Sequence, residues 1–247
     1  MRSALLAVLT LGLALGAPAT QAQSNRYLEA GLPAVSRDWS GPDYERAVQI
    51  LSSGKIALPR FADPQGATLL RRMTSTENFA LHHNKSVPLQ ARMEDYLKLY
   101  QGAASLLKLY YAEPAIGGGA PHQELAAFLA FLLHGSALGI ELIDEFLPTI
   151  PKDDRYETRM AGLKQMSSGV TQVFQGAEET LAERQLLSAD DLSVILRAME
   201  STLPRIKKAF PADVRVELRK KLEEDKARFT GQEDLQRLGA MIRELSV

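Results

Sequence analysis

The sequence predicts an all-α fold: an up-and-down helical bundle of seven or eight helices with one central apolar helix, preceded by a signal peptide. Apolar residues recur in steps of four and three residues over several long segments, which is the period of a helix face that packs on neighbours. Helix-start signals precede most of these segments. No segment shows the alternating, β-branched pattern of strands bounded by hairpin turns. Short connections rich in proline and glycine favour antiparallel neighbouring helices.

The first 22 residues have the layout of a secretory signal peptide. Arg2 supplies a positive charge, an apolar run extends from Ala4 to Ala17, and small residues suit cleavage after Ala22 or, alternatively, after Ala19. A membrane anchor is the competing interpretation, but the run is shorter than the roughly 20 residues that span a bilayer. We therefore expect an exported protein, periplasmic or secreted, with no stable membrane span after cleavage.

Composition excludes several classes of site. The chain has no cysteine, so it cannot have a lipid-modified cysteine, a disulfide, a thiol nucleophile or a thiolate metal site. Its formal net charge is −1, which gives no electrostatic footprint for nucleic acid or for an anionic membrane surface. The basic cluster at 215–228 alternates with acids four residues apart, a pattern typical of an exposed helix stabilised by ion pairs.

The N-terminal part of the exported chain divides into a leader and a domain. Residues 23–38 have no sustained period and predict an extended leader, whereas 39–247 are long enough for a single helical-bundle domain with its own core. Ser40 is a predicted helix cap followed by Pro42 in the first turn, and Asp63 begins a second helix in the same way.

Longer helices follow, joined by breaks. The clearest helical period begins after Pro88, and a segment rich in glycine and proline at 112–121 predicts a flexible connection after it. Ser188 with Asp191 is a helix-start signal, and Pro204 should kink the helix that follows. The predicted helices of this part cover residues 89–110, 125–146, 156–181, 192–210, a charged helix opened by Pro211, and 235–245.

The segment 125–148 is the most apolar stretch after the signal peptide. Between Glu124 and Glu141 lie 16 uncharged residues, about 24 Å of helix, against a bilayer core of about 30 Å. We therefore favour a core helix wrapped by neighbouring helices over a membrane span. Gly135 and Gly139 form a pair of small residues one turn apart, which predicts close packing by another helix.

Two groups of side chains are candidate sites. Tyrosines of the 89–110 helix place rings with hydroxyl groups along one helix, which could line a pocket for an apolar ligand with a polar end. His134 and Glu141 lie near one line of the apolar helix, but no Glu-x-x-His pair accompanies them, so a core histidine is favoured over a metal site. The predicted ligand-binding residues are Tyr96, Tyr100, Tyr110, His134 and Glu141; no metal ligand or cofactor is predicted.

The polar segment 74–88 is the second candidate. A capping box from Thr74 to Glu77 fits there, and we expect a break or surface loop of the kind through which rigid bundles contact partners. A plain solvated loop is the alternative. The predicted partner-binding residues are Glu77, Asn78, His82, His83, Asn84 and Lys85.

Three functional hypotheses follow. The first is an exported, non-enzymatic interaction protein, such as a periplasmic adaptor, chaperone or inhibitor, whose partner is another protein. The second is a carrier of an apolar small molecule in the bundle core, between the 96–111 and 125–146 helices. The third is a hydrolase using His82, His83 or His134; it has the least support, because no Gly-x-Ser-x-Gly or His-Glu-x-x-His motif occurs.

Overall fold

The computed structural model of the protein describes residues 25–112, 122–183 and 187–246. Over these ranges the fold is all-helical and contains no strand, as predicted. The predicted signal peptide and most of the predicted connection at 112–121 lie outside the described residues. The helices of ten residues or more are α2 (Gly41–Leu51), α3 (Pro64–Met73), α5 (Leu89–Ala112), α6 (His122–Phe146), α7 (Tyr156–Ala182), α8 (Ala189–Ile206), α9 (Ala212–Lys226) and α10 (Gln232–Leu245).

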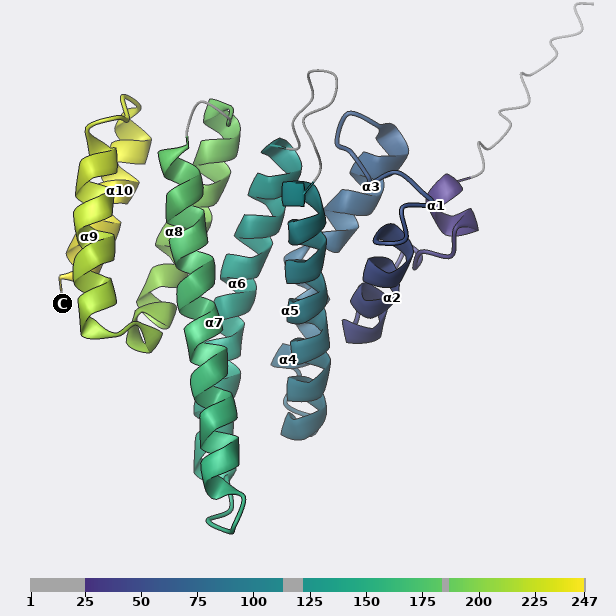
Figure 1. Ribbon diagram of the computed structural model, residues 1–247, viewed down its shortest axis with the longest axis horizontal. Helices are drawn as coiled ribbons and strands as arrows, with labels where there is room; N and C mark the ends of the chain where they lie inside the picture. Colours follow the sequence, from purple (N-terminus) through teal and green to yellow (C-terminus); the bar gives the residue numbers. More distant parts are fainter. Residues whose placement is uncertain (1–24, 113–121, 184–186, 247) are drawn as a thin grey trace, which may run out of the picture.

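Figure 1 shows these helices spread along the longest axis of the molecule, with α2 and α3 at one end, α9 and α10 at the other, and α7 and α8 overlapping in this view. Helix α2 packs on α5, α5 on α6, α6 on α8, α8 on α10, and α10 on α9. Helix α7 lies against α6, α8 and α9. Helix α6 therefore contacts α5, α7 and α8, and it occupies the centre of the core.

Side-chain caps begin the helices where the sequence predicted them. Ser40 and Asp43 form a reciprocal capping box at α2, and Ser188 forms the same box with Asp191 at α8. Asp63 accepts a hydrogen bond of 2.9 Å from the backbone N–H of Gly66 and so caps α3. Each cap satisfies backbone N–H groups that have no partner inside the helix.

The segment expected to be a surface loop at 74–88 is largely helical instead. It contains the 3-10 helix η1 (Thr76–Phe79) and the short helix α4 (Ala80–His83). The cap is Ser75, whose hydroxyl accepts from the N–H of Glu77, and not the predicted Thr74. Thr74 is the C-terminal cap of α3, and its own hydroxyl donates to the carbonyl of Leu70.

The predicted leader also departs from expectation. Within 23–38, the described residues include α1 (Arg26–Glu29), and Tyr27 and Leu32 are buried in the core. Arg26 forms an ion pair of 2.6 Å with Asp63 at the start of α3. The segment packs on the helical body because two large apolar side chains anchor it there.

The C-terminal helices end close to their predicted limits, with one difference. Helix α8 includes Pro204 but ends two residues later at Ile206, and a 3-10 turn, η4 (Lys207–Ala209), replaces its predicted continuation to Phe210. Pro204 lies in the last turn of α8 and has no N–H with which to donate the helical hydrogen bond to the preceding turn. The charged helix α9 forms two of the expected four-residue ion pairs, Lys221 with Glu217 and Lys220 with Glu224.

Helix α6 is the predicted apolar core helix. With η2 (Leu147–Thr149) it forms the one stretch among the described residues that is long and apolar enough to cross a membrane, and 78% of its most apolar window is buried inside the protein. Neighbouring helices therefore cover most of its apolar surface, as predicted for a core helix.

Gly135 and Gly139 of α6 provide the space in which α5 packs. A methyl group at Gly139 would lie 2.2 Å from the hydroxyl oxygen of Tyr96 and 2.8 Å from its ring carbon Cζ, and one at Gly135 would lie 3.0 Å from the ring of Tyr100. The small residues thus admit tyrosine rings from α5 and not, as expected, the backbone of another helix.

Substitution of Gly139 by alanine should therefore destabilise the protein. We expect Gly139→Ala to lower the free energy of unfolding by about 1–3 kcal/mol, because the ring of Tyr96 must move in a packed interior. Gly176→Ala on α7 is the matched control: its added methyl group would meet nothing within 4 Å. The control should raise stability by about 0.5–1 kcal/mol through helix propensity alone. Urea unfolding followed by circular dichroism measures both, and equal changes in the two variants would contradict the packing argument.

Candidate binding groove

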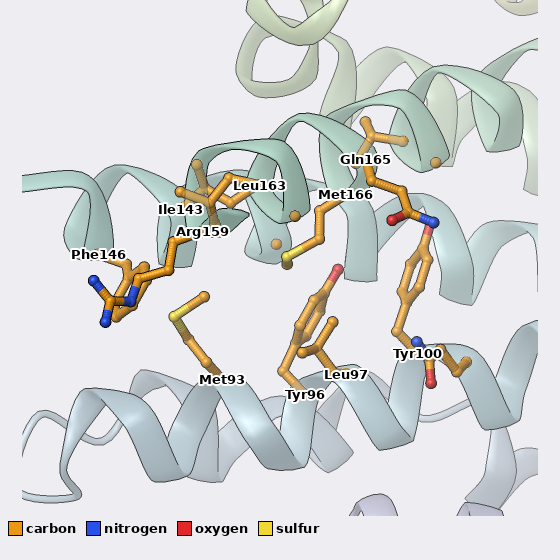
Figure 2. Close-up of a pocket in the computed structure, with 15 residues that line it drawn as sticks. Met93, Tyr96, Leu97, Tyr100, Ile143, Phe146, Arg159, Leu163, Gln165 and Met166 are labelled. Carbon is orange, nitrogen blue, oxygen red and sulfur yellow. The ribbon is translucent and has the colours of Figure 1, made fainter. Parts of the chain in front are cut away.

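An apolar groove lies between α5, α6 and α7, with a volume of about 500 Å³ (Figure 2). Helix α6 forms its floor, and α5 and α7 form its two walls. The lining residues are Met93, Tyr96, Leu97, Tyr100 and Gln101 from α5, Gly139, Ile143 and Phe146 from α6, and Arg159, Gly162, Leu163, Gln165, Met166, Gly169 and Val170 from α7.

The α5 wall is neutral because its hydroxyl groups are occupied by α6. The Tyr96 hydroxyl donates to the backbone carbonyl of Gly135 at 3.0 Å, and the Tyr100 hydroxyl shares a hydrogen bond of 2.8 Å with the Ser136 hydroxyl. Burial raises the pKa of Tyr100 to about 12 and the pKa of Tyr96 well above its ordinary value. Both phenols therefore stay protonated at physiological pH and present their ring faces and edges to the groove.

The α7 wall combines apolar side chains with two glycines. Leu163, Met166 and Val170 supply the apolar surface, and Figure 2 shows Met166 reaching toward Tyr96 across the groove. A methyl group added at Gly162 or Gly169 would meet nothing within 4 Å, so the wall is open at both positions. The two glycines leave space in the groove that a side chain would otherwise occupy.

The polar groups of the groove lie at its ends. In Figure 2, Arg159 lies beside Phe146 at one end, and Gln165 lies near Tyr100 at the other. Beyond the second end, the Tyr111 and Thr180 hydroxyls form a hydrogen bond of 3.2 Å that joins α5 to α7. An elongated apolar molecule in the groove would thus have polar side chains at both termini.

The predicted ligand-binding residues divide between different places. Tyr96 and Tyr100 line the groove. Tyr110 does not, because it is buried and donates a hydrogen bond of 2.8 Å to the Pro59 carbonyl. His134 and Glu141 are not groove residues either. The α7 wall was not predicted from the sequence; its signal is the spacing of Gly162, Gly169 and Gly176, seven residues apart on one helix face.

His134 and Glu141 instead line a smaller polar pocket, of about 320 Å³, together with His83. The remaining lining residues are Thr76, Phe79, Leu138 and Arg205. Arg205 lies 3.5 Å from Glu141, and burial together with the Arg205 charge lowers the pKa of His134. The pocket joins residues from both predicted sites, but the described residues hold no cluster of three or more potential ligands arranged for a metal ion.

Two of the predicted partner-binding residues are buried. Asn78 accepts from the Trp39 N–H at 2.8 Å and donates to the Arg72 carbonyl at 2.7 Å. His82 has no exposed side-chain surface, and its Nε2 lies 3.0 Å from an Asp95 oxygen. These two residues hold the segment on the body and cannot contact a partner directly.

The other four, Glu77, His83, Asn84 and Lys85, are exposed. Lys85 is also an ion-pair partner of Glu145 at the end of α6. The surface predicted for a partner is therefore smaller than expected and is held on a folded segment.

A buried arginine ties this segment to the wall of the groove. Arg92 of α5 donates to the carbonyls of His82 and Val87 at 3.1 Å each, and forms two hydrogen bonds with the Glu145 carboxylate. Glu145 directly precedes Phe146 of the groove. The pair thus fixes α4, α5 and the end of α6 in one arrangement.

The chain matches no protein-family model, and no curated protein or solved structure is significantly similar to it. Its function is therefore argued from the geometry of these sites.

The Arg92–Glu145 pair should make folding stability depend on pH. Hydrogen bonds from Arg92 and then Lys85 lower the pKa of Glu145 from 4.5 to about 2. A carboxylate with a lowered folded-state pKa stabilises the fold above its unfolded pKa, and this contribution is lost as pH falls from about 4.5 toward 2. We expect Glu145→Gln to be less stable at neutral pH and to show a shallower loss of stability across that window. Urea unfolding at a series of pH values measures this, and parallel profiles for the two proteins would contradict it.

Proposed function

We propose that this protein is an exported, non-enzymatic binding protein that carries an apolar small molecule in the groove between α5, α6 and α7. The observation that supports this most directly is the groove itself: about 500 Å³ of space lined almost wholly by apolar side chains, with few polar groups at its ends. Small-molecule sites have volumes of about 300–1,000 Å³ and this type of lining.

Hydrophobic transfer would supply the binding energy. Each methylene group moved from water into the groove contributes about 0.8 kcal/mol, before the cost of ordering the ligand. The two methionines Met93 and Met166 face the groove from opposite walls. Methionine side chains are flexible and polarisable, so they adapt to ligands of differing shape.

The lining also favours binding over chemistry. Among the described residues that line the groove there is no histidine, aspartate, glutamate or serine, so these residues offer neither a general base nor an activated hydroxyl nucleophile. His82 is enclosed by Phe79 and Tyr96 and has no exposed side-chain surface. The groove and His82 therefore give the hydrolase hypothesis no support.

Export is part of the proposal, and its support is the layout of residues 1–22. An apolar ligand that must cross an aqueous compartment needs a protein to shield it, which fits a carrier in the periplasm or outside the cell.

We further infer that α5 to α10 form an up-and-down bundle. The ion pairs Arg205–Glu141 and Lys208–Asp144 join the C-terminal ends of α8 and α6, so these two helices run in the same direction. Lys207–Glu244 and Arg237–Glu200 relate α10 to α8 in the same way, and Lys221–Glu178 relates α9 to α7. Alternate helices of the series thus run parallel, which favours antiparallel sequence neighbours.

A role in binding another protein, as an adaptor, chaperone or inhibitor, is the second candidate. The observation that favours it is the exposed group Glu77, His83, Asn84 and Lys85 on a segment anchored by buried side chains. Such a surface is preformed and would lose little conformational entropy on binding. The exposed residues of this surface do not indicate which kind of partner would bind. The lining of the groove does indicate an apolar ligand, so the carrier function is the better supported proposal.

The groove predicts binding that a single added side chain blocks. We expect the neutral dye N-phenylnaphthylamine to bind the protein with increased fluorescence, and native mass spectrometry of the purified protein to show a bound apolar species. Gly169→Leu should weaken dye binding about tenfold, because the leucine occupies space that the ligand needs. Gly176→Leu is the control: it changes the same residue on the same helix outside the groove. A clean ligand-free mass, no dye binding, or equal binding by both variants would overturn the proposal.

A further inference from the structure

The groove has one ionised side chain among its lining residues, and it is a cation. Arg159 lies at the end of the groove beside Phe146, whereas the opposite end has the neutral amide of Gln165. None of the described residues that line the groove has a carboxylate. Asp153, outside the lining, pairs with Arg159 at 2.7 Å and offsets part of its charge, so this end favours an anionic head group through the donors that Asp153 leaves unused.

The Arg159 guanidinium is held in place and still has donors to offer. Nη1 donates to an Asp153 oxygen at 2.7 Å and to the Pro151 carbonyl at 3.3 Å, and Nη2 donates to the other Asp153 oxygen at 3.1 Å. A guanidinium has five N–H donors. Three are used by these described neighbours, so two are available to a ligand carboxylate.

The groove is elongated along α7. Its α7 wall extends from Arg159 to Val170, about 16 Å at the helical rise of 1.5 Å per residue. A groove of this length can accommodate an extended hydrocarbon chain.

We propose that the ligand is a single-chain carboxylate amphiphile of the fatty-acid type, with its carboxylate on Arg159 and its chain extended along Met93, Leu97 and Met166. This inference rests on the proposed carrier function and specifies its ligand. The carboxylate forms charge-assisted hydrogen bonds with the two available donors, and most of the chain lies along apolar side chains, with its end near the Gln165 amide.

Displacement of N-phenylnaphthylamine by three probes of equal chain length tests the head-group preference. Dodecanoate, dodecanol and dodecyltrimethylammonium are compared below their critical micelle concentrations, at a pH where the carboxylate is ionised. We expect dodecanoate to bind most tightly and the ammonium compound most weakly. Arg159→Gln should weaken dodecanoate binding about threefold to fivefold, the upper part of the range for an ion pair at a partly exposed site, and leave dodecanol unchanged.

Two further variants separate a specific contact from a change of overall charge. Lys152→Gln removes an exposed positive charge seven residues earlier that does not line the groove, and it should leave dodecanoate binding unchanged. Asp153→Asn removes the carboxylate that competes for Arg159, while its amide oxygen can still accept from the Arg155 backbone N–H. It should tighten dodecanoate binding and not dodecanol binding.

The outcomes distinguish the two proposals. If dodecanoate and dodecanol bind equally to the native protein and to Arg159→Gln, the head-group inference is wrong while the apolar carrier function stands. If Lys152→Gln weakens dodecanoate as much as Arg159→Gln does, the effect is one of net charge and the inference is also wrong. If no probe displaces the dye because the dye itself does not bind, the carrier function fails. Thermal unfolding by circular dichroism confirms that each variant is folded.

Discussion

The close approach of two α5 tyrosines to two α6 glycines determines how the middle of this protein is arranged. Tyr96 can lie against Gly139 only because that residue has no side chain, and its hydroxyl then reaches the Gly135 carbonyl at 3.0 Å. The contact fixes the distance between α5 and α6 and gives both tyrosine hydroxyls a partner inside the core. The rings of Tyr96 and Tyr100 and the backbone at Gly139 also line the groove, so the position of the groove and its neutral inner wall both depend on this contact.

A buried ion pair secures the end of the same helix pair. Desolvating Arg92 is unfavourable, and the structure compensates with the Glu145 carboxylate and two backbone carbonyls. Because those carbonyls belong to His82 and Val87, the polar segment after α3 folds against α5 and is not left as a loop. The energetic requirement of one arginine thus organises a segment whose own sequence is polar.

Local patterns in the sequence were sufficient for the long helices and their caps, since periodicity and capping act within one or two turns. They were not sufficient for the segment 74–88, because Asn78 and Arg92 form hydrogen bonds with residues far away in the sequence. Asn78, for example, accepts from the backbone N–H of Trp39, 39 residues away. The tyrosine wall was predicted from the α5 spacing. The α7 wall was not, because the glycines that open it have meaning only when α7 is placed opposite α5.

The groove follows from leaving one seam between helices incompletely packed. Leu163, Met166 and Val170 face the groove from α7, and Gly162 and Gly169, which lie between and beside them, contribute no atoms that could meet α5. Protein interiors are otherwise close-packed, and apolar surface left without neighbours forfeits dispersion contacts that a larger side chain would provide. Alanine or leucine at these glycines would also favour the helix. Under the proposed carrier function, a bound apolar ligand would complete the packing of this seam.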